Sequence, residues 1–248
     1  MAESHSRAGG SSGEFDIVII GAGGHGREVR SYIEDLVRRG ERLRLVGFVD
    51  EGKPRGMWAG VEILGGFEAL EAFLRLRQGW VLHYITAVGD NAARQRLVQK
   101  VQRVVRNMEC AGGNLVAWTL RHPMAIVGED VEIGEGSCLA PGSIITTRVR
   151  IGKNCIVNVN ASISHDSTIG DFVNVNPGAT ICGNVRIGKG CYIGAGATVI
   201  DGVSVGEWTI VGAGAVVVDD LPPHVIAVGV PARVIKENPA GGEGEDAR

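Results

Sequence analysis

The sequence predicts two units: a small α/β domain with a parallel sheet, followed by a β-helix of six-residue repeats. The front half alternates apolar strand-like runs with helical stretches, and its first strand runs into the glycine-rich turn Gly21-x-Gly23-x-x-Gly26. In the second half an aliphatic residue returns every six positions from Val127 to Val217 without a miss. Neither the helical period of about 3.6 nor the strand period of about 2 produces this pattern, whereas a hexapeptide β-helix does.

The composition is that of a folded chain with a core of small side chains. Of 248 residues, 44% are hydrophobic, only 5% are aromatic and 38 are glycine. The formal net charge of −3 gives no basic face and therefore argues against nucleic-acid binding.

The chain ends and the cysteines indicate in which cellular compartment we expect the protein. Residues 1–13 lack an apolar signal region, and no run of about 18 apolar residues exists, so we expect neither secretion nor a membrane span. Residues 1–13 and 237–248 are interpreted as flexible tails. The five cysteines show no CxxC pair and are expected to be small buried thiols in a reducing cytoplasm.

The front domain, residues 14–110, is predicted to be Rossmann-like. An apolar strand over 17–20 leads through the glycine turn into a helix, and "LVGFVDE" forms a second strand that ends at Asp50 and Glu51. A helix is expected over 67–77, and "VLHYITAVGDNAARQRLVQKVQ" gives a further strand, turn and helix.

A glycine turn between strand and helix favours a nucleotide, because the glycines allow close approach and the helix N-terminus offers free N–H groups to phosphate. NAD is one candidate, and a turn without a ligand is another. Two features argue against NAD. The α/β part ends near residue 110 with no dehydrogenase-like domain behind it, and the polar His25 lies inside the turn.

In the β-helix, residues 111–236, each hexad is expected to supply one short strand and one turn, with three hexads per triangular coil. The aliphatic residue points inward, and a small or aliphatic residue four positions later fits the corner. The fifteen intervals make about five coils. Glycines directly after the aliphatic residue are expected to adopt turn dihedrals; they stand at 128, 134, 152, 170, 188, 194, 206 and 212.

These motifs together resemble the hexapeptide-repeat sugar acetyltransferases. The chain carries "GAGGHGREV", then "GFVDE", then "AVGDNAAR", then the repeats and the ending "VGVPARVIK". The resemblance spans residues 15–236 and is closest to the acetyltransferases of UDP-linked 4-amino sugars of the bacillosamine type. Perosamine N-acetyltransferases and sialic acid O-acetyltransferases are more distant cousins. It implies a left-handed helix, acetyl-CoA as donor, and a homotrimer with active sites between subunits.

The resemblance also implies substrate contacts for the front domain. The phosphate and sugar side would be lined by Gly23, Gly24 and His25. Asp50 and Glu51 would face the base or ribose, and Gly89 with Asn91 would close the pocket. Relatives often have two aspartates where this chain has Asp50-Glu51.

His165 is the candidate general base, because it is the only histidine within the sixteen-hexad run. A single histidine cannot supply the three ligands of a metal hydratase, so no metal is expected. Its third position in the hexad lies on the outer surface, where a neutral imidazole can take a proton from an attacking amine. Asp166 can fix the ring, as in the serine-protease triad. An exposed turn histidine and a turn-forming aspartate are the alternatives.

Further contacts are implied by family position. Asn158 would reach the site of a neighbouring subunit, or alternatively form a turn ladder with Asn160. Asn174 stands where some relatives place a second histidine near the cofactor. The pantetheine arm of acetyl-CoA is expected along Gly194, Ala195, Gly212 and Ala213, although small residues there also serve coil packing.

The function expected from these features is acetyl-CoA-dependent N-acetylation of a nucleotide-linked amino sugar in surface glycan biosynthesis. O-acetylation of a sugar hydroxyl and a non-enzymatic nucleotide-binding trimer are the alternatives. Neither a nucleic acid nor a membrane is an expected partner.

Overall fold

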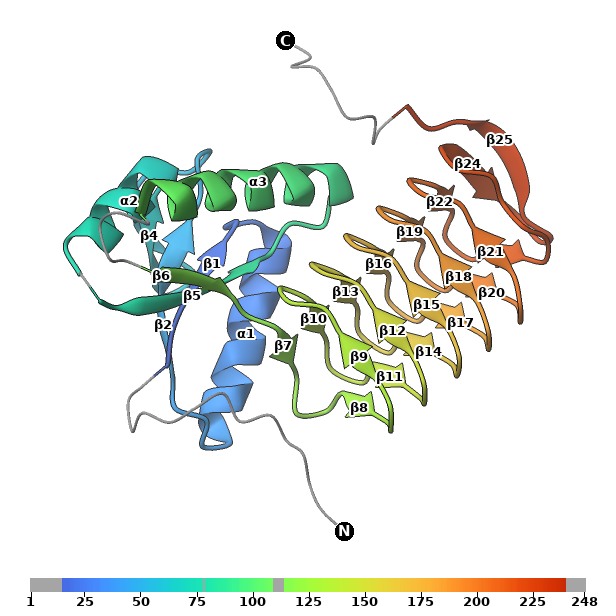
Figure 1. Cartoon of the computed structure of the whole chain (residues 1–248), viewed down its shortest axis with the longest axis horizontal. Coiled ribbons are helices and arrows are strands. Elements are labelled where there is room, and N and C mark those ends of the chain that lie inside the picture. Colours follow the sequence, from blue (N-terminus) through green and yellow to red (C-terminus); the bar gives the residue numbers. More distant parts are fainter. Residues whose placement is uncertain (1–14, 78, 109–113, 240–248) are drawn as a thin grey trace.

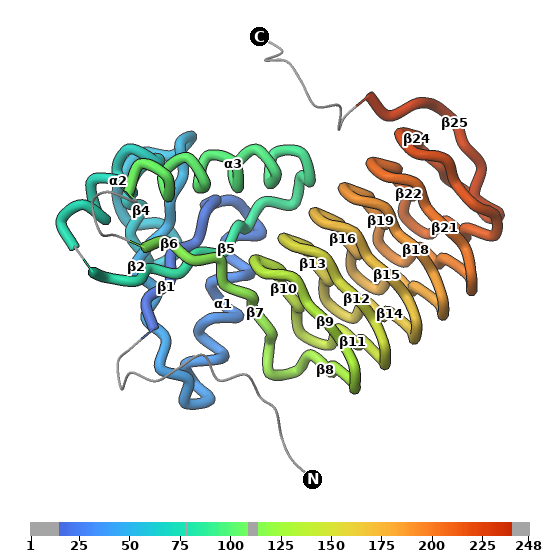
Figure 2. Tube along the Cα trace, in the orientation of Figure 1, coloured from blue at the N-terminus to red at the C-terminus, as the bar shows by residue number. Residues whose placement is uncertain are grey.

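The computed structural model describes residues 15–77, 79–108 and 114–239. It consists of a small α/β domain that lies beside one end of an elongated β-helical prism (Figure 1). The tube along the Cα trace shows the coils of the prism stacked in parallel, from β7 near the small domain to β24 at the far end (Figure 2). Both predicted units are therefore confirmed.

The small domain has a six-stranded sheet, sheet A, in the order β3-β4-β2-β1-β5-β6. All neighbours are parallel except the β3–β4 hairpin. The strands are β1 Phe15–Ile20, β2 Leu43–Val49, β3 Gly56–Trp58, β4 Val61–Gly65, β5 Val81–Thr86 and β6 Asn114–Ala117. The expected strands and helices are present, whereas the hairpin and β6 were not predicted.

Successive residues of β1 point to opposite faces of sheet A, as strand geometry requires. Ile17 and Ile19 pack against α1 (Gly24–Arg38) and against residues at the start of the prism. Val18 and Ile20 pack against α2 (Phe67–Arg75) and α3 (Asn91–Met108). The prism therefore shares an apolar core with the face of sheet A that carries α1.

The change from one unit to the next comes later than residue 110. β6 pairs in parallel with β5 and completes sheet A. The first prism strand is β7, Leu120–Arg121, which pairs with β10. The short connection between β6 and β7 is thus the covalent link between the two units.

The prism has three parallel sheets, B, C and D, which the chain visits in turn. Sheet B contains β7 Leu120–Arg121, β10 Cys138–Leu139, β13 Ile156–Val157, β16 Asn174–Val175, β19 Tyr192–Ile193, β22 Ile210–Val211, β24 Val225–Val228 and the antiparallel β25 Arg233–Glu237. Sheet C contains β8 Ile126–Val127, β11 Ile144–Ile145, β14 Ser162–Ile163, β17 Thr180–Ile181, β20 Thr198–Val199 and β23 Val216–Val217. Sheet D contains β9 Glu132–Ile133, β12 Arg150–Ile151, β15 Thr168–Ile169, β18 Arg186–Ile187 and β21 Ser204–Val205.

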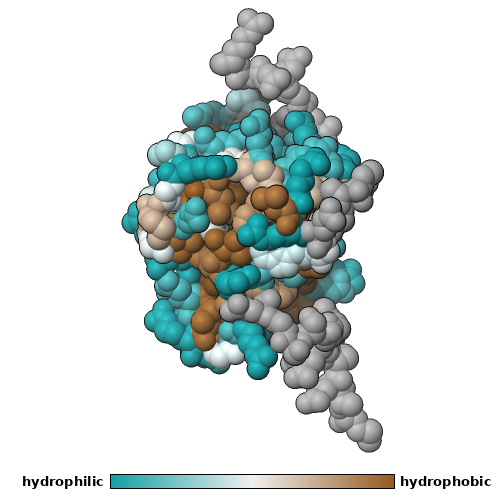
Figure 3. All heavy atoms as spheres, turned by 90° about the vertical axis from the view of Figure 1, so that its left-hand side faces the viewer, coloured by the Kyte–Doolittle hydropathy of each residue, from teal (hydrophilic) through white to brown (hydrophobic). Residues whose placement is uncertain are grey.

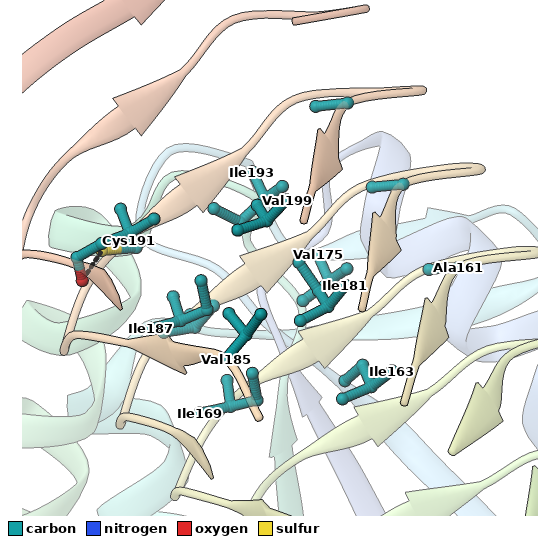
Figure 4. Close-up of a cluster of buried hydrophobic side chains, with 14 of the residues drawn as sticks. Ala161, Ile163, Ile169, Val175, Ile181, Val185, Ile187, Cys191, Ile193 and Val199 are labelled. Carbon is teal, nitrogen blue, oxygen red and sulfur yellow. Dashed lines mark hydrogen bonds between the residues drawn. The ribbon is translucent and has the colours of Figure 1, made fainter. Parts of the chain in front are cut away.

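The repeating aliphatic residues fill the inside of the prism, as predicted. Figure 4 shows Ile163, Ile169, Val175 and Ile181 converging from the three sheets. Each of these side chains is at most 2% exposed. Because every coil leaves its apolar side chains against the next coil, the core runs continuously along the prism.

The predicted role of the glycines that follow the aliphatic residues is wrong. None of them has a positive φ; the left-handed positions lie two residues further on and include Asp130, Asn154 and Phe172. At these glycines the next coil is too close for a side chain. A Cβ on Gly188 would lie 2.5 Å from the backbone nitrogen of Glu207.

The small-domain end of the molecule carries apolar residues among hydrophilic ones (Figure 3). The exposed apolar side chains of this domain include Met57, Leu76 and Val81. This end faces away from the prism (Figure 1) and takes no part in the junction between the units.

A buried arginine on the small domain forms hydrogen bonds to the prism. The guanidinium of Arg94 on α3 donates to the backbone oxygens of Asn154 and Phe172 at 2.9 Å and to Oδ1 of Asn174 at 2.7 Å. Its Nη1 donates to the backbone oxygen of Val88 at 2.8 Å. Burial lowers the pKa of Arg94 to about 10, which leaves it protonated at neutral pH.

Asn91 and Asn174 complete the junction. The amide of Asn91 donates to the oxygens of Gly190 and Cys191 at 3.0 and 2.9 Å. The amide of Asn174 donates to the oxygen of Gly89 at 2.5 Å. Hydrogen bonds between buried groups thus fix the orientation of the small domain relative to sheet B.

Replacing Arg94 with methionine should destabilise the protein, because buried carbonyl oxygens lose their donors and stay away from water. We expect a loss of about 2–4 kcal/mol, seen as a fall of the thermal midpoint by roughly 5–15 °C. Arg96→Met is the matched control, since Arg96 lies two residues further on the same helix and is exposed. Equal midpoints for the two variants would show that Arg94 does not hold the junction.

Candidate active site

His165 lies at the corner between sheets C and D, two residues after the end of β14. Its side chain is 57% exposed, which confirms the predicted outer position. Nδ1 of the ring is 2.8 Å from Oδ2 of Asp166. When Nδ1 carries the proton and donates to Asp166, Nε2 is left as the acceptor.

Asp166 has a second partner, one that the sequence did not point to. Its Oδ1 lies 2.8 Å from Nε of Arg148, and its Oδ2 lies 3.0 Å from Nη2 of the same guanidinium. The hydrogen bond with His165, and next that with Arg148, lowers the pKa of Asp166 below its ordinary value. Asp166 also has φ 62°, so it forms the turn and contacts the histidine at once.

The imidazole of His165 packs on Gly183, which stands one coil further along. A Cβ at position 183 would lie 2.6 Å from Cε1 and 2.7 Å from Nε2 of the ring. The backbone nitrogen of Gly183 donates to Oδ1 of Asp201 at 2.9 Å. Because residue 183 has no side chain, the imidazole of His165 can occupy this space at the corner.

A cavity of about 490 Å³ lies where the small domain meets sheet B. The small domain contributes the end of its glycine turn and the start of α3. The prism contributes outward residues of sheet B and residues of the two corners that flank it, between sheets D and B and between sheets B and C. The lining residues include His25, Glu28, Gly89, Asn91, Asn158, Asn174, Asn176, Tyr192, Trp208 and Ile210.

His25 is held at this cavity by Glu28, three residues along α1. Nδ1 of His25 is 2.9 Å from Oε2 of Glu28, and this hydrogen bond lowers the pKa of Glu28. Nε2 of His25 and Oδ1 of Asn91 are buried and have no partner among the described residues. Buried polar atoms without a partner mark places where a ligand can complete the hydrogen bonding.

The glycine turn leaves room for a ligand. A Cβ on Gly23 or on Gly24 would meet nothing within 4 Å, whereas one on Gly26 would lie 2.2 Å from the oxygen of Gly21. Helix α1 starts at Gly24 with no side-chain cap, so its first N–H groups face this open space.

Asp50 and Glu51 lie at the predicted end of β2 but already have partners. Oδ2 of Asp50 accepts from the nitrogen of Ala22 at 2.7 Å, and Oδ1 accepts from Gly52 at 2.9 Å. Glu51 pairs with Lys100 at 2.6 Å. Both line a second cavity of about 540 Å³ between β2, β4 and α2. Asp50 therefore holds the glycine turn, and contact with a base or ribose stays a prediction.

Three predicted ligand contacts have structural tasks. Asn91, Gly89 and Asn174 form the junction described above, and both ends of the Asn174 amide are engaged there. The expectation that Asn174 contacts the cofactor stays a prediction, and the observed bonds assign it to the junction.

The small residues expected to bind pantetheine divide into two kinds. Gly194 and Gly212 are required by packing, because a Cβ on either would come within 2.7 Å of the following coil. Ala195 and Ala213 are exposed at the corner between sheets B and C, where Asn158 also stands. Packing between coils therefore explains the two glycines. It does not explain the two exposed alanines, for which a contact with pantetheine stays a prediction.

One chain does not bring His165 and the cavity together. His165 stands at the corner between sheets C and D, whereas the cavity is bordered by sheet B and the two corners that flank it. Sequence reasoning also missed Arg148, Gly183 and Glu28. The first two are detectable as residues one coil, or about eighteen positions, from the dyad, and Glu28 as the i+3 neighbour of His25 on a helix.

Within residues 15–77, 79–108 and 114–239, no three His, Cys, Asp or Glu side chains gather into a possible metal site. Over the same part of the chain, no helix is long and apolar enough to cross a membrane.

Comparison with known proteins places these features in a family. Residues 16–101 match the PglD N-terminal domain, and residues 184–219 match the bacterial transferase hexapeptide model of six repeats. The GDP-perosamine N-acetyltransferase of Escherichia coli O157:H7 is 31% identical over 144 residues, 57% of this chain. That match spans 58% of the relative's length, less than two thirds of it.

Solved structures resemble the chain over nearly its full length. One is a histidine-to-alanine mutant of the GDP-perosamine N-acetyltransferase from Caulobacter crescentus in complex with CoA and GDP-perosamine. It is 34% identical with a TM-score of 0.77, and the similarity covers 90% of this chain and 97% of that one. The acetyltransferase domain of PglB from Neisseria gonorrhoeae FA1090 is 29% identical with a TM-score of 0.76, over 89% and 99%. The chain therefore belongs to the hexapeptide-repeat sugar N-acetyltransferases that carry a PglD-type N-terminal domain.

Proposed function

We propose that this protein transfers the acetyl group of acetyl-CoA to an amino group of a nucleotide-linked amino sugar. The observation that carries the proposal is the His165–Asp166 dyad on a rigid outer corner of the prism, in a chain that also has a glycine turn with unpartnered polar atoms nearby. The relatives with CoA and GDP-perosamine bound support this pairing of donor and acceptor. A role in surface glycan synthesis follows from the same acceptor class.

The dyad suits direct acyl transfer. The amine nitrogen attacks the thioester carbonyl carbon while Nε2 of His165 takes its proton, and the C–S bond then breaks as the imidazolium returns a proton to the leaving sulfur. Asp166 holds Nδ1–H and stabilises the imidazolium. Burial raises the pKa of Cys138, Cys155 and Cys191 to about 12, so their thiols stay protonated at neutral pH. Burial also raises the pKa of the partly buried Cys182 above its ordinary value.

The small domain would hold the nucleotide part of the acceptor. Gly23 and Gly24 give the diphosphate access to the N-terminus of α1, and His25 supplies the unpartnered Nε2. Asp50 and Glu51 would lie toward the base or ribose beside the second cavity. Gly89 and Asn91 would border the sugar.

The complete site would form between neighbouring subunits of a trimer. The outward residues of sheet C carry no charge; they are Ile126, Ile144, Ser162, Thr180, Thr198 and Val216. Those of sheet D include Glu132, Arg150 and Arg186. An uncharged face suits burial against other copies, as a charged face does not.

Three prisms that turn sheet C toward a common axis would bring two different corners together. The corner with His165 would meet the neighbour's corner after sheet B, where Asn158, Ala195 and Ala213 stand. Acetyl-CoA would then lie along the alanines, with Asn158 near the reacting groups. Both substrates would then reach His165 of one subunit from the cavity of the neighbouring subunit. Within a single chain, His165 and the cavity lie at different corners of the prism.

The first test is transfer itself. We expect acetyl-CoA and nucleotide-linked 4-amino sugars to give a product heavier by one acetyl group in mass spectrometry, and His165→Ala to lower kcat at least about a hundredfold with KM nearly unchanged. Unchanged melting and oligomeric state are the controls. Acetylation of the matching hydroxyl sugar instead would indicate O-transfer. If His165→Ala keeps more than about a third of kcat, the proposed base is wrong.

The second test is ligand choice in the small domain. Calorimetry should show UDP or GDP binding with a Kd in the micromolar range, about −8 kcal/mol, and NAD at least about tenfold weaker. Binding should fall with His25→Ala, because that variant loses the unpartnered Nε2. Tight NAD binding with no response to UDP or GDP would remove the nucleotide-sugar assignment.

The third test asks whether the site is shared between subunits. His165→Ala and His25→Ala are each expected to be nearly inactive, but co-expression of the two chains should restore activity. In random trimers, about a quarter of the sites would draw an intact His165 from one subunit and an intact His25 from the next. Light scattering should give a trimer for both variants. No recovery in mixed trimers would place the whole site within one chain.

A further inference from the structure

Arg148 contacts the proposed catalytic pair from the preceding coil. Two nitrogens of its guanidinium contact the carboxylate of Asp166: Nε lies 2.8 Å from Oδ1, and Nη2 lies 3.0 Å from Oδ2. Oδ2 is also the atom that lies 2.8 Å from Nδ1 of His165. The three side chains therefore form one connected row, with Asp166 in the middle.

The fold explains why these side chains meet. Arg148 and Asp166 occupy the same corner position in successive coils, and both have left-handed backbones, with φ 53° and 62°. The strands that follow them, β12 and β15, pair in register. Side chains in such equivalent positions project in the same direction about 4.8 Å apart, a distance that an arginine fork readily bridges.

A carboxylate held only by the histidine can rotate about its side-chain bonds at an exposed corner. The paired contact with a planar guanidinium removes that freedom, because both oxygens are engaged at fixed angles. In this orientation Oδ2 faces Nδ1 of the ring. Gly183 supports the ring from the next coil, so the imidazole is fixed from both sides.

We propose that Arg148 is a positioning residue of the acyl-transfer site: it orients Asp166 toward His165 and offsets part of the negative charge beside the imidazole. The proposal rests on His165 being the base, as set out above. Arg148 itself does not contact the reacting atoms and acts through Asp166.

The charges around the ring give the expected direction of the pH effect. Asp166 and Arg148 lie on one side of the ring; the thiol of Cys182 belongs to the same coil as Gly183, and Asp201 belongs to the next coil. Without Arg148, two carboxylates would face the ring with no cation to balance them. Protonated imidazole would then be more favourable, and the neutral base would persist only at higher pH.

The test uses the full-length enzyme and compares pH profiles of kcat/KM for variants of one residue. Arg148→Met should move the acid limb to higher pH by about half a unit or more and lower kcat at the optimum by roughly tenfold. Arg148→Lys keeps the charge without the fork, so its acid limb should stay near that of the wild type while kcat falls in part. Arg150→Met is the matched control, because this exposed arginine pairs with Glu132 instead.

The outcomes separate this proposal from the one it rests on. An unchanged acid limb and kcat in Arg148→Met, together with an inactive His165→Ala, would overturn the role of Arg148 and leave the base in place. A rise in KM for acetyl-CoA with an unmoved acid limb would also overturn it and make Arg148 a cofactor contact. An active His165→Ala would instead refute the base itself. If Arg150→Met moves the acid limb by the same amount as Arg148→Met, the shift comes from the general surface charge and the proposal is overturned.

Discussion

The stacking register of the prism decides what the site can be. Residues about eighteen positions apart lie one above another, because consecutive strands within each sheet pair in register. This register sets Arg148 beside Asp166 and Gly183 beside His165. The site is thus assembled from three consecutive coils that backbone hydrogen bonds hold in register.

The same register limits which side chains the corners tolerate. Inside, each coil accepts aliphatic residues, and where a glycine follows one of them, as at Gly188, the next coil leaves no room for a Cβ. The outward strand positions and the outer corners are the places that carry chemical groups. An imidazole there needs no conformational change to reach a substrate, so the cost of ordering it is met when the chain folds.

The position of the small domain depends on side-chain hydrogen bonds to the prism. Arg94 donates three hydrogen bonds to the prism, and Asn91 and Asn174 add three more bonds across the same junction. Hydrogen bonds lost in such a dry region are not replaced by water. The cavity lined by His25 and Asn158 therefore has walls from two units that are fixed relative to each other.

Much of this architecture could be predicted from sequence, because period and glycine placement report directly on the backbone. The repeats located the prism, its inward residues and the exposed position of His165. The β3–β4 hairpin and β6 were missed since these short strands carry no clear alternation. The roles of Arg94 and Asn174 were missed for another reason: their partners are backbone oxygens in the other unit, and no local pattern encodes a contact across a junction.

The two units also divide the work of the proposed reaction. The corner with His165, Asp166 and Gly183 is part of a regular lattice, where a change in one coil disturbs its neighbours. The glycine turn and the ends of β2 and β5 are connections, which tolerate change far better. Acyl transfer to an amine asks for the same base whatever the sugar, whereas recognition of the nucleotide and sugar must differ between acceptors. A rigid prism for the chemistry and a separate domain for the acceptor therefore allow substrate choice to vary while the dyad stays in place.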